Sequence, residues 1–83
     1  MKGELRLNLP LGKLSTRFLE EFAKLVNNNE GNFALKTIIY TNDGDNYKLE
    51  AAKHIFPSNA LLELLVNNRL DFNLSLFEDE KSG

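Results

Sequence analysis

Three oxygen-bearing side chains in one short segment could bind calcium: Asp43, Asp45 and Asn46. An EF-hand loop supplies such oxygen ligands at alternate positions, with glycine at its sixth position and glutamate at its twelfth. Counted from Asp43, the third position is Asp45 but the fifth is Tyr47, so the alternation fails. We therefore interpret this segment as a solvated hairpin turn rather than as a metal site.

The single histidine of the chain, His54, could act as a general base. Such a base needs a partner within hydrogen-bond reach and usually a nucleophile beside it. Ser58, Ser75 and Thr37 carry hydroxyl groups, but none of them lies in the glycine-flanked motif that exposes a nucleophilic serine. An ordinary surface histidine is the better interpretation, and we assign no catalytic residue.

Composition excludes other kinds of site. The 83 residues include no cysteine, which removes disulfides, thiolate nucleophiles and cysteine-based zinc sites. Glycines 3, 12, 31 and 44 are isolated and form no phosphate-binding loop. Ten basic residues are scattered among twelve acidic ones, whereas a nucleic-acid binder gathers its lysines and arginines on one face. We expect no metal, no cofactor and no direct contact with nucleic acid.

Length and hydropathy predict one small domain over residues 1–83, ordered from about residue 4 to 77 and followed by an acidic tail at 78–83. Hydrophobic residues make up 42% and charged residues 27%, which is typical of globular sequences. No apolar run approaches the roughly 20 residues of a membrane span, and the first residues do not resemble a secretory signal. We therefore expect a cytoplasmic location and no membrane partner.

Four strand patterns and two helix patterns position these residues. Strands are expected at 4–9, 33–41, 46–55 and 70–76, where apolar residues alternate or β-branched and aromatic residues gather. Helices are expected from about 12–15 to 27 and from Ser58 to about 66, because apolar residues recur there at three- and four-residue spacing. Asp43-Gly44 predicts a hairpin turn between the second and third strands, and Ser58 is the expected N-cap.

The order β-α-β-β-α-β predicts an α+β, ferredoxin-like fold, in which a split βαβ arrangement forms a four-stranded antiparallel sheet with two helices on one face. Strand 33–41 would then lie at an edge. The expected core consists of Leu5, Leu7, Leu9, Phe18, Phe22, Leu25, Phe33, Leu35, Ile39, Leu49, Leu61, Leu65, Phe72, Leu74 and Leu76.

An RNA-recognition module has the same element order and stacks bases on aromatic residues of its first and third strands. The outward positions of those strands are instead Glu4, Arg6, Asn8, Lys48, Glu50 and Ala52. Because none of them is aromatic, the sequence argues against base stacking.

One predicted surface is apolar. If Phe33 and Leu35 face the helices, Ile38 and Tyr40 face outward on strand 33–41. An apolar edge strand can take up a partner strand or pair with another copy. An equally good interpretation is that both residues are ordinary β formers that neighbouring side chains cover.

Five segments together resemble a known protein family. They are residues 4–11 (ELRLNLPL), 19–32 (LEEFAKLVNNNEGN), 35–38 (LKTI), 55–65 (IFPSNALLELL) and 70–72 (LDF). The chain is similar, from about residue 4 to 76, to the extreme C-terminal domain of the alpha subunit of bacterial DNA polymerase III, the replicative polymerase. It most resembles members from Bacteroidetes-like bacteria.

This resemblance implies a fragment of a DNA-directed DNA polymerase that follows the OB-fold and lacks the metal-binding aspartates of the polymerase active site. It also implies binding to the tau subunit, which ties the polymerase to the clamp loader. No motif identifies the tau contacts, so the candidates are the strand around Ile38 and Tyr40 and the segment from Phe72 to Glu80. The protein-binding residues expected there are Ile38, Tyr40, Phe72, Leu74, Leu76 and Phe77.

Two alternatives stay open at this point. The chain could be a structural domain of an unrelated protein that self-associates weakly through its edge strand, which predicts a concentration-dependent dimer. It could also be a small-ligand sensor, which would need a pocket between the sheet and the helices.

Overall fold

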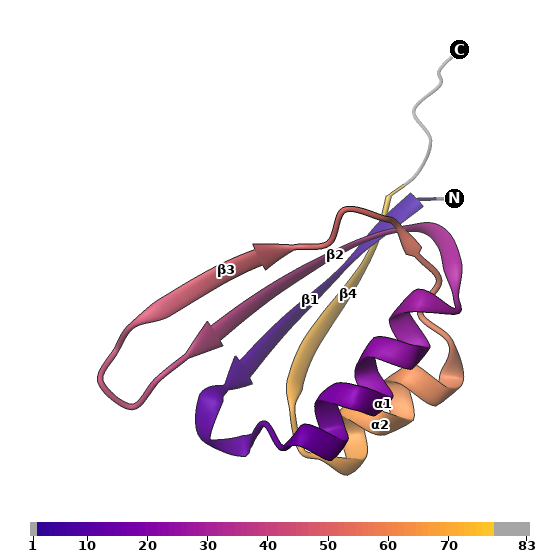
Figure 1. Ribbon diagram of the computed structural model, residues 1–83. Coiled ribbons are helices and arrows are strands. Elements are labelled where there is room, and N and C mark those ends of the chain that lie inside the picture. Colours follow the sequence, from indigo (N-terminus) through magenta and orange to yellow (C-terminus); the bar gives the residue numbers. More distant parts are fainter. Residues whose placement is uncertain (1, 78–83) are drawn as a thin grey trace.

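The computed structural model in Figure 1 describes residues 2–77, and the expected acidic tail at 78–83 lies outside this range. The α+β class and the order β-α-β-β-α-β are confirmed. The elements are β1 (Lys2–Pro10), the short 3-10 helix η1 (Leu11–Lys13), α1 (Thr16–Asn27), β2 (Glu30–Tyr40), β3 (Asn46–Glu50), α2 (Asn59–Asn67) and β4 (Asp71–Phe77).

The sheet differs from the expected one in the order and direction of its strands. Its order is β3-β2-β1-β4, and β1 pairs directly with β2 in parallel, whereas β1–β4 and β2–β3 are antiparallel. The prediction of a purely antiparallel sheet was therefore wrong, because the sheet is mixed. The prediction that strand 33–41 lies at an edge was wrong as well, since β2 runs between β1 and β3.

The composition of β3 explains this order. A split βαβ arrangement would insert the third strand between β1 and β2, where both of its edges meet neighbouring strands. β3 has five residues, all exposed, and carries Lys48 and Glu50. β2 spans eleven residues and buries Phe33, Leu35 and Thr37. The longer apolar strand therefore occupies the interior and the short charged strand the edge.

Both helices lie on one face of the sheet, as expected (Figure 1). Each begins at a serine whose hydroxyl oxygen accepts a backbone hydrogen bond: Ser15 from Phe18 N at 3.0 Å and Ser58 from Leu61 N at 3.2 Å. These N-caps satisfy donors that the first helical turn leaves without partners. The predicted cap at Ser58 is thus confirmed. Neither helix within residues 2–77 combines the length and the apolarity needed to cross a membrane.

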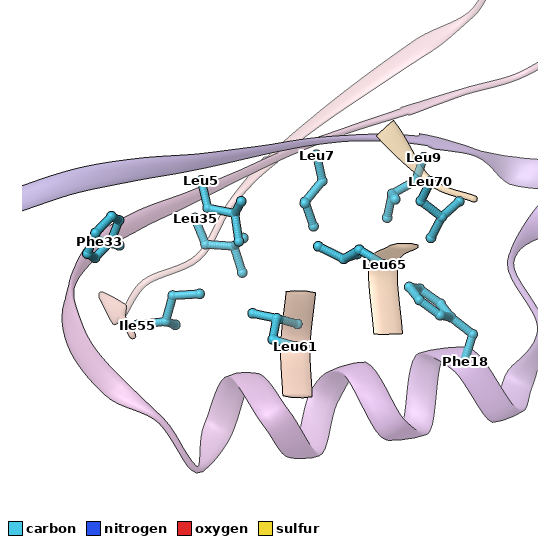
Figure 2. Packing of buried hydrophobic residues seen from close by; sticks show 10 residues of the cluster. All are labelled: Leu5, Leu7, Leu9, Phe18, Phe33, Leu35, Ile55, Leu61, Leu65 and Leu70. Atoms are coloured by element: carbon cyan, nitrogen blue, oxygen red, sulfur yellow. The ribbon is translucent and has the colours of Figure 1, made fainter. Parts of the chain in front are cut away.

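The core lies between β1, β2 and the helices, where Leu5, Leu7 and Leu9 point toward Leu61 and Leu65 (Figure 2). Most predicted core residues are buried or half-buried there. Three are wrong: Leu49, Leu74 and Leu76 are 55%, 39% and 59% exposed, because they lie on edge strands that the helices do not cover fully. The prediction missed Ile55 and Leu70, which are buried. They lie just outside the helices and strands, before α2 and before β4, and belong to no periodic run.

Strand β3 also ends earlier than expected, at Glu50 rather than near Ile55. The chain bends at Ala52–Lys53, and Ile55 then forms isolated bridges with Glu30 and Phe33 at the start of β2. Ile55 is therefore held against the opposite end of β2 from the β2–β3 hairpin, which places it over the core.

Candidate protein-binding surfaces

Ile38 and Tyr40 lie on the sheet face opposite the helices, which we call the open face. Their positions follow from the register, in which Ile38 is opposite Asn8 of β1 and Lys48 of β3. Ile38 is half-buried and Tyr40 is 38% exposed at the end of the strand. Because both edges of β2 are already paired, no partner strand can add there, and strand addition at this site is ruled out.

Charged side chains next to Ile38 stabilise the open face. Arg6 and Lys36 are directly opposite each other on β1 and β2, an arrangement of like charges that would destabilise the sheet. The Glu4 carboxylate forms ion pairs with both, with Arg6 Nε and with Lys36 Nζ at 3.2 Å. The hydrogen bond from Arg6 is the main reason that the pKa of Glu4 lies below its ordinary value.

The second predicted surface lies on β4, at the opposite end of the sheet order from β3. Phe72, Leu74 and Leu76 face the helix side, opposite Leu7, Leu5 and Gly3 of β1. Phe77 faces the open side, opposite Lys2. Phe72 is half-buried, whereas Leu74, Leu76 and Phe77 are 39%, 59% and 48% exposed. The part of the predicted segment beyond Phe77 lies outside the described residues.

β4 has the features of a strand that accepts another strand. It pairs only with β1, so its outer edge has no neighbouring strand within residues 2–77. Natural edge strands are usually protected by charged side chains, proline or bulges. After Asp71, β4 reads Phe-Asn-Leu-Ser-Leu-Phe and contains none of these. Its backbone groups and its apolar side chains are therefore both accessible.

The two predicted surfaces do not form one site. Asn8 is opposite Ile38 on one side and Asp71 on the other, so Ile38 lies at the level where β4 begins. Leu76 and Phe77 lie at the other end of β4, next to Gly3 and Lys2. A partner that follows the β4 edge therefore does not need Ile38 or Tyr40.

The residues considered for chemistry are dispersed. Asp45 lies in the β2–β3 turn, where its backbone N–H donates to the Thr41 hydroxyl at 3.2 Å and Gly44 has a φ of 93°. His54 is exposed in the segment before Ile55. Ser58 caps α2, while Thr37 is buried on the helix side of β2. Within the described part of the chain, no cluster of three His, Cys, Asp or Glu side chains could hold a metal ion.

Sequence reasoning missed a second apolar strip on the helix side of β3. Tyr47 and Leu49 are 54% and 55% exposed there, opposite Ile39 and Thr37 of β2. The sequence contains a signal for this placement, because Lys48 and Glu50 alternate with them in a strand of only five residues. Short charged strands are typical of sheet edges.

Two surface hollows of the described residues lie away from the region between the sheet and the helices, where a ligand sensor would need its pocket. One shallow hollow is lined by outer helix residues such as Glu21 and Glu63, and another by open-face residues such as Arg6 and Lys48. Neither lies between the sheet and the helices.

Searches against protein-family models, curated proteins and solved structures found no match to this chain.

Proposed function

We propose that this chain is a non-catalytic protein-binding domain that receives an extended segment of a partner on the outer edge of β4. The observation that carries the proposal is an accessible edge strand without charge, proline or bulge between Phe72 and Phe77. Strand addition of this kind gains affinity from backbone hydrogen bonds and specificity from alternate side chains. Here Leu74 and Leu76 would meet apolar residues of the incoming segment.

The partner that we propose is the tau subunit of the bacterial clamp loader, with this chain as a C-terminal domain of the DNA polymerase III alpha subunit. The support for this identity is the resemblance of five segments, between about residues 4 and 76, to that domain. A cytoplasmic location is part of the same proposal. The domain would tether the polymerase without taking part in nucleotide transfer.

Calorimetric titration of the 83-residue chain with the C-terminal part of tau from the same organism tests this proposal. We expect saturable binding, weakened at least about ten-fold by Leu76→Lys, because a charge would be buried beside the added strand. Leu49→Lys is the matched control, since Leu49 and Leu76 are similarly exposed on the same sheet face at opposite edges. Absence of binding by the folded chain would refute the tau assignment.

The variant Tyr40→Asp distinguishes binding at the β4 edge from binding at the open face. A partner strand on β4 does not reach Tyr40, so this variant should keep the affinity of the unmodified chain. Weaker binding by Tyr40→Asp with unchanged binding by Leu76→Lys would move the contact to the open face around Ile38.

The alternative is a structural domain that only self-associates. Since β2 is interior, such pairing would have to use β3 or β4 rather than strand 33–41. This alternative predicts a dimer of the free chain together with no response to the tau fragment, so sedimentation and calorimetry distinguish the two functions.

A further inference from the structure

We infer that β4 of one chain pairs with β4 of a second copy, in antiparallel register about a two-fold axis at Leu74, and that a partner strand must displace this copy. The pairing would join two four-stranded sheets into one continuous sheet of eight. The pairing of two β4 strands does not depend on the partner's identity. The displacement of the second copy by a partner strand rests on the proposed function.

The sequence of β4 is complementary to itself in this register. A two-fold axis at Leu74 places Leu74 opposite its own copy and Phe72 opposite Leu76 on the helix side. Asn73 would then face Ser75, and Asp71 would face Phe77, on the open side. Apolar residues thus meet apolar residues at every helix-side position, and directly opposed pairs of this kind stabilise a sheet.

Charge favours the Leu74-centred register over other ways of pairing two β4 strands. Asp71 is the only charged residue of β4, and the Leu74-centred register separates the two copies of Asp71 to opposite ends of the paired strands. A register shifted toward the beginning of the strand would bring these carboxylates together, which is destabilising. A register shifted by one residue would place helix-side residues opposite open-face residues.

The helices leave room for this pairing. Leu74 and Leu76 are 39% and 59% exposed although they point to the helix side, so neither helix covers this part of the edge. Ten large hydrophobic residues of the described chain are exposed, and Leu74, Leu76 and Phe77 are the three of them that lie on one unprotected edge. A two-fold interface requires one patch that is complementary to itself, and this edge meets that condition.

Sedimentation and cysteine cross-linking test the pairing in the full 83-residue chain. Because the chain has no cysteine, each substitution introduces the only thiol. Leu74→Cys places two thiols directly opposite each other across the axis, within reach of a disulfide after slight adjustment. Leu76→Cys is the register control, since two copies of residue 76 would lie about 13–14 Å apart along the strands. Leu49→Cys on β3 reports chance collisions.

We expect sedimentation of the unmodified chain to show a concentration-dependent dimer, and Leu74→Cys to cross-link much faster than Leu76→Cys and Leu49→Cys. Leu74→Lys should weaken the dimer at least about ten-fold while circular dichroism shows an intact fold, because it opposes two ammonium groups. A chain that stays monomeric at all concentrations, or equal cross-linking of Leu74→Cys and Leu76→Cys, would overturn the inference.

The same samples separate this inference from the proposed function. If the tau fragment binds, it should lower the rate of Leu74→Cys cross-linking in proportion to the fraction of chain bound. Tau binding to a strictly monomeric chain would overturn the self-pairing and leave the tether. A Leu74-centred dimer that does not respond to the tau fragment would confirm the pairing and overturn the tether.

Discussion

The two edges of the sheet, β3 and β4, expose apolar side chains to a similar extent but are protected differently. Tyr47 and Leu49 of β3 are 54% and 55% exposed, and Leu76 and Phe77 of β4 are 59% and 48% exposed. β3 carries Lys48 and Glu50 between and after its apolar residues. β4 carries no charge from Phe72 to Phe77. Exposure therefore does not distinguish the edges, but charge does.

This difference shows which edge can accept another strand. A strand that pairs with β3 would have to accommodate Lys48 and Glu50 on the open face, where Glu50 is already opposite Lys36 of β2. A strand that pairs with β4 meets Asn73 and Ser75 on that face. These two side chains are small, polar and uncharged, so they are compatible with many opposing residues. Protection by charge is the usual way in which natural edges avoid unwanted pairing. We interpret β3 as the protected edge and β4 as the edge that can accept another strand.

The largest expected effect compares a substitution in the core with one on the β3 edge. Leu7 of β1 is fully buried between Thr37 and Phe72, so Leu7→Ala should lower the free energy of unfolding by about 2–5 kcal/mol. Leu49→Ala, on the exposed β3 edge, should lower it by less than about 1 kcal/mol. Chemical denaturation measures both. Equal losses would mean that β3 belongs to the core and is not a free edge.

Gly3→Ala should loosen β4 specifically. Gly3 is opposite Leu76 and beside the Phe33 ring, and a Cβ there would overlap that ring and lie 2.5 Å from the Ser75 carbonyl oxygen. Such overpacking costs about 1–3 kcal/mol. Gly12→Ala is the control, since no heavy atom beyond its own turn of chain lies within 4 Å of its Cβ position. Hydrogen exchange should accelerate in β4 but not in β3, and uniform acceleration would contradict this account.

Removing the charges of β3 should make the two edges alike. The double variant Lys48→Thr/Glu50→Thr keeps strand-forming residues but leaves β3 unprotected. We expect it to form species larger than the β4-paired dimer, because each chain would then have two edges that accept a strand. Light scattering measures this, and an unchanged mass distribution would show that charge is not what protects β3.

Arg69→Gly should stabilise the turn from which β4 begins. Arg69 has a φ of 56°, which costs a residue with a side chain about 1 kcal/mol. Its N–H donates to Val66 O at 2.9 Å, and Leu70 N–H donates to Leu65 O at 3.0 Å, so the turn ends α2 as a Schellman motif. Glycine removes the strain, and we expect thermal unfolding to show a gain of about 0.5–1 kcal/mol. A loss would show that the Arg69 side chain stabilises the turn.

The smallest expected effect concerns Glu4 on interior strand β1. Its pKa in the folded protein is lowered from 4.5, chiefly by the hydrogen bond from Arg6. The stabilisation is therefore fully present above about pH 5 and is lost as pH falls through the lowered pKa. The difference in melting temperature between the unmodified chain and Glu4→Gln should shrink below pH 4.5. A difference that stays constant into that range would contradict the ion pairs.

Local pattern was sufficient for the elements and their order, and for part of the core. Alternation in residues 4–9 and the stripe that contains Phe18 required only neighbouring residues, as did the cap at Ser58. Ile55 and Leu70 were missed because their burial depends on distant partners. Leu74 and Leu76 have the same alternation as Leu5 and Leu7, so nothing local shows that the helices stop short of them.

By itself, the sequence determined that residues 2–77 form two α-helices and four strands, that the chain contains no thiol chemistry, and that β4 carries no charge after Asp71. These properties depend on residue type and on spacing along the chain. Only the tertiary structure decided that β1 pairs directly with β2 and that β3, rather than β2, lies at an edge. Strand order depends on competition among non-local pairings, because the same alternating pattern serves an interior strand and an edge strand equally well.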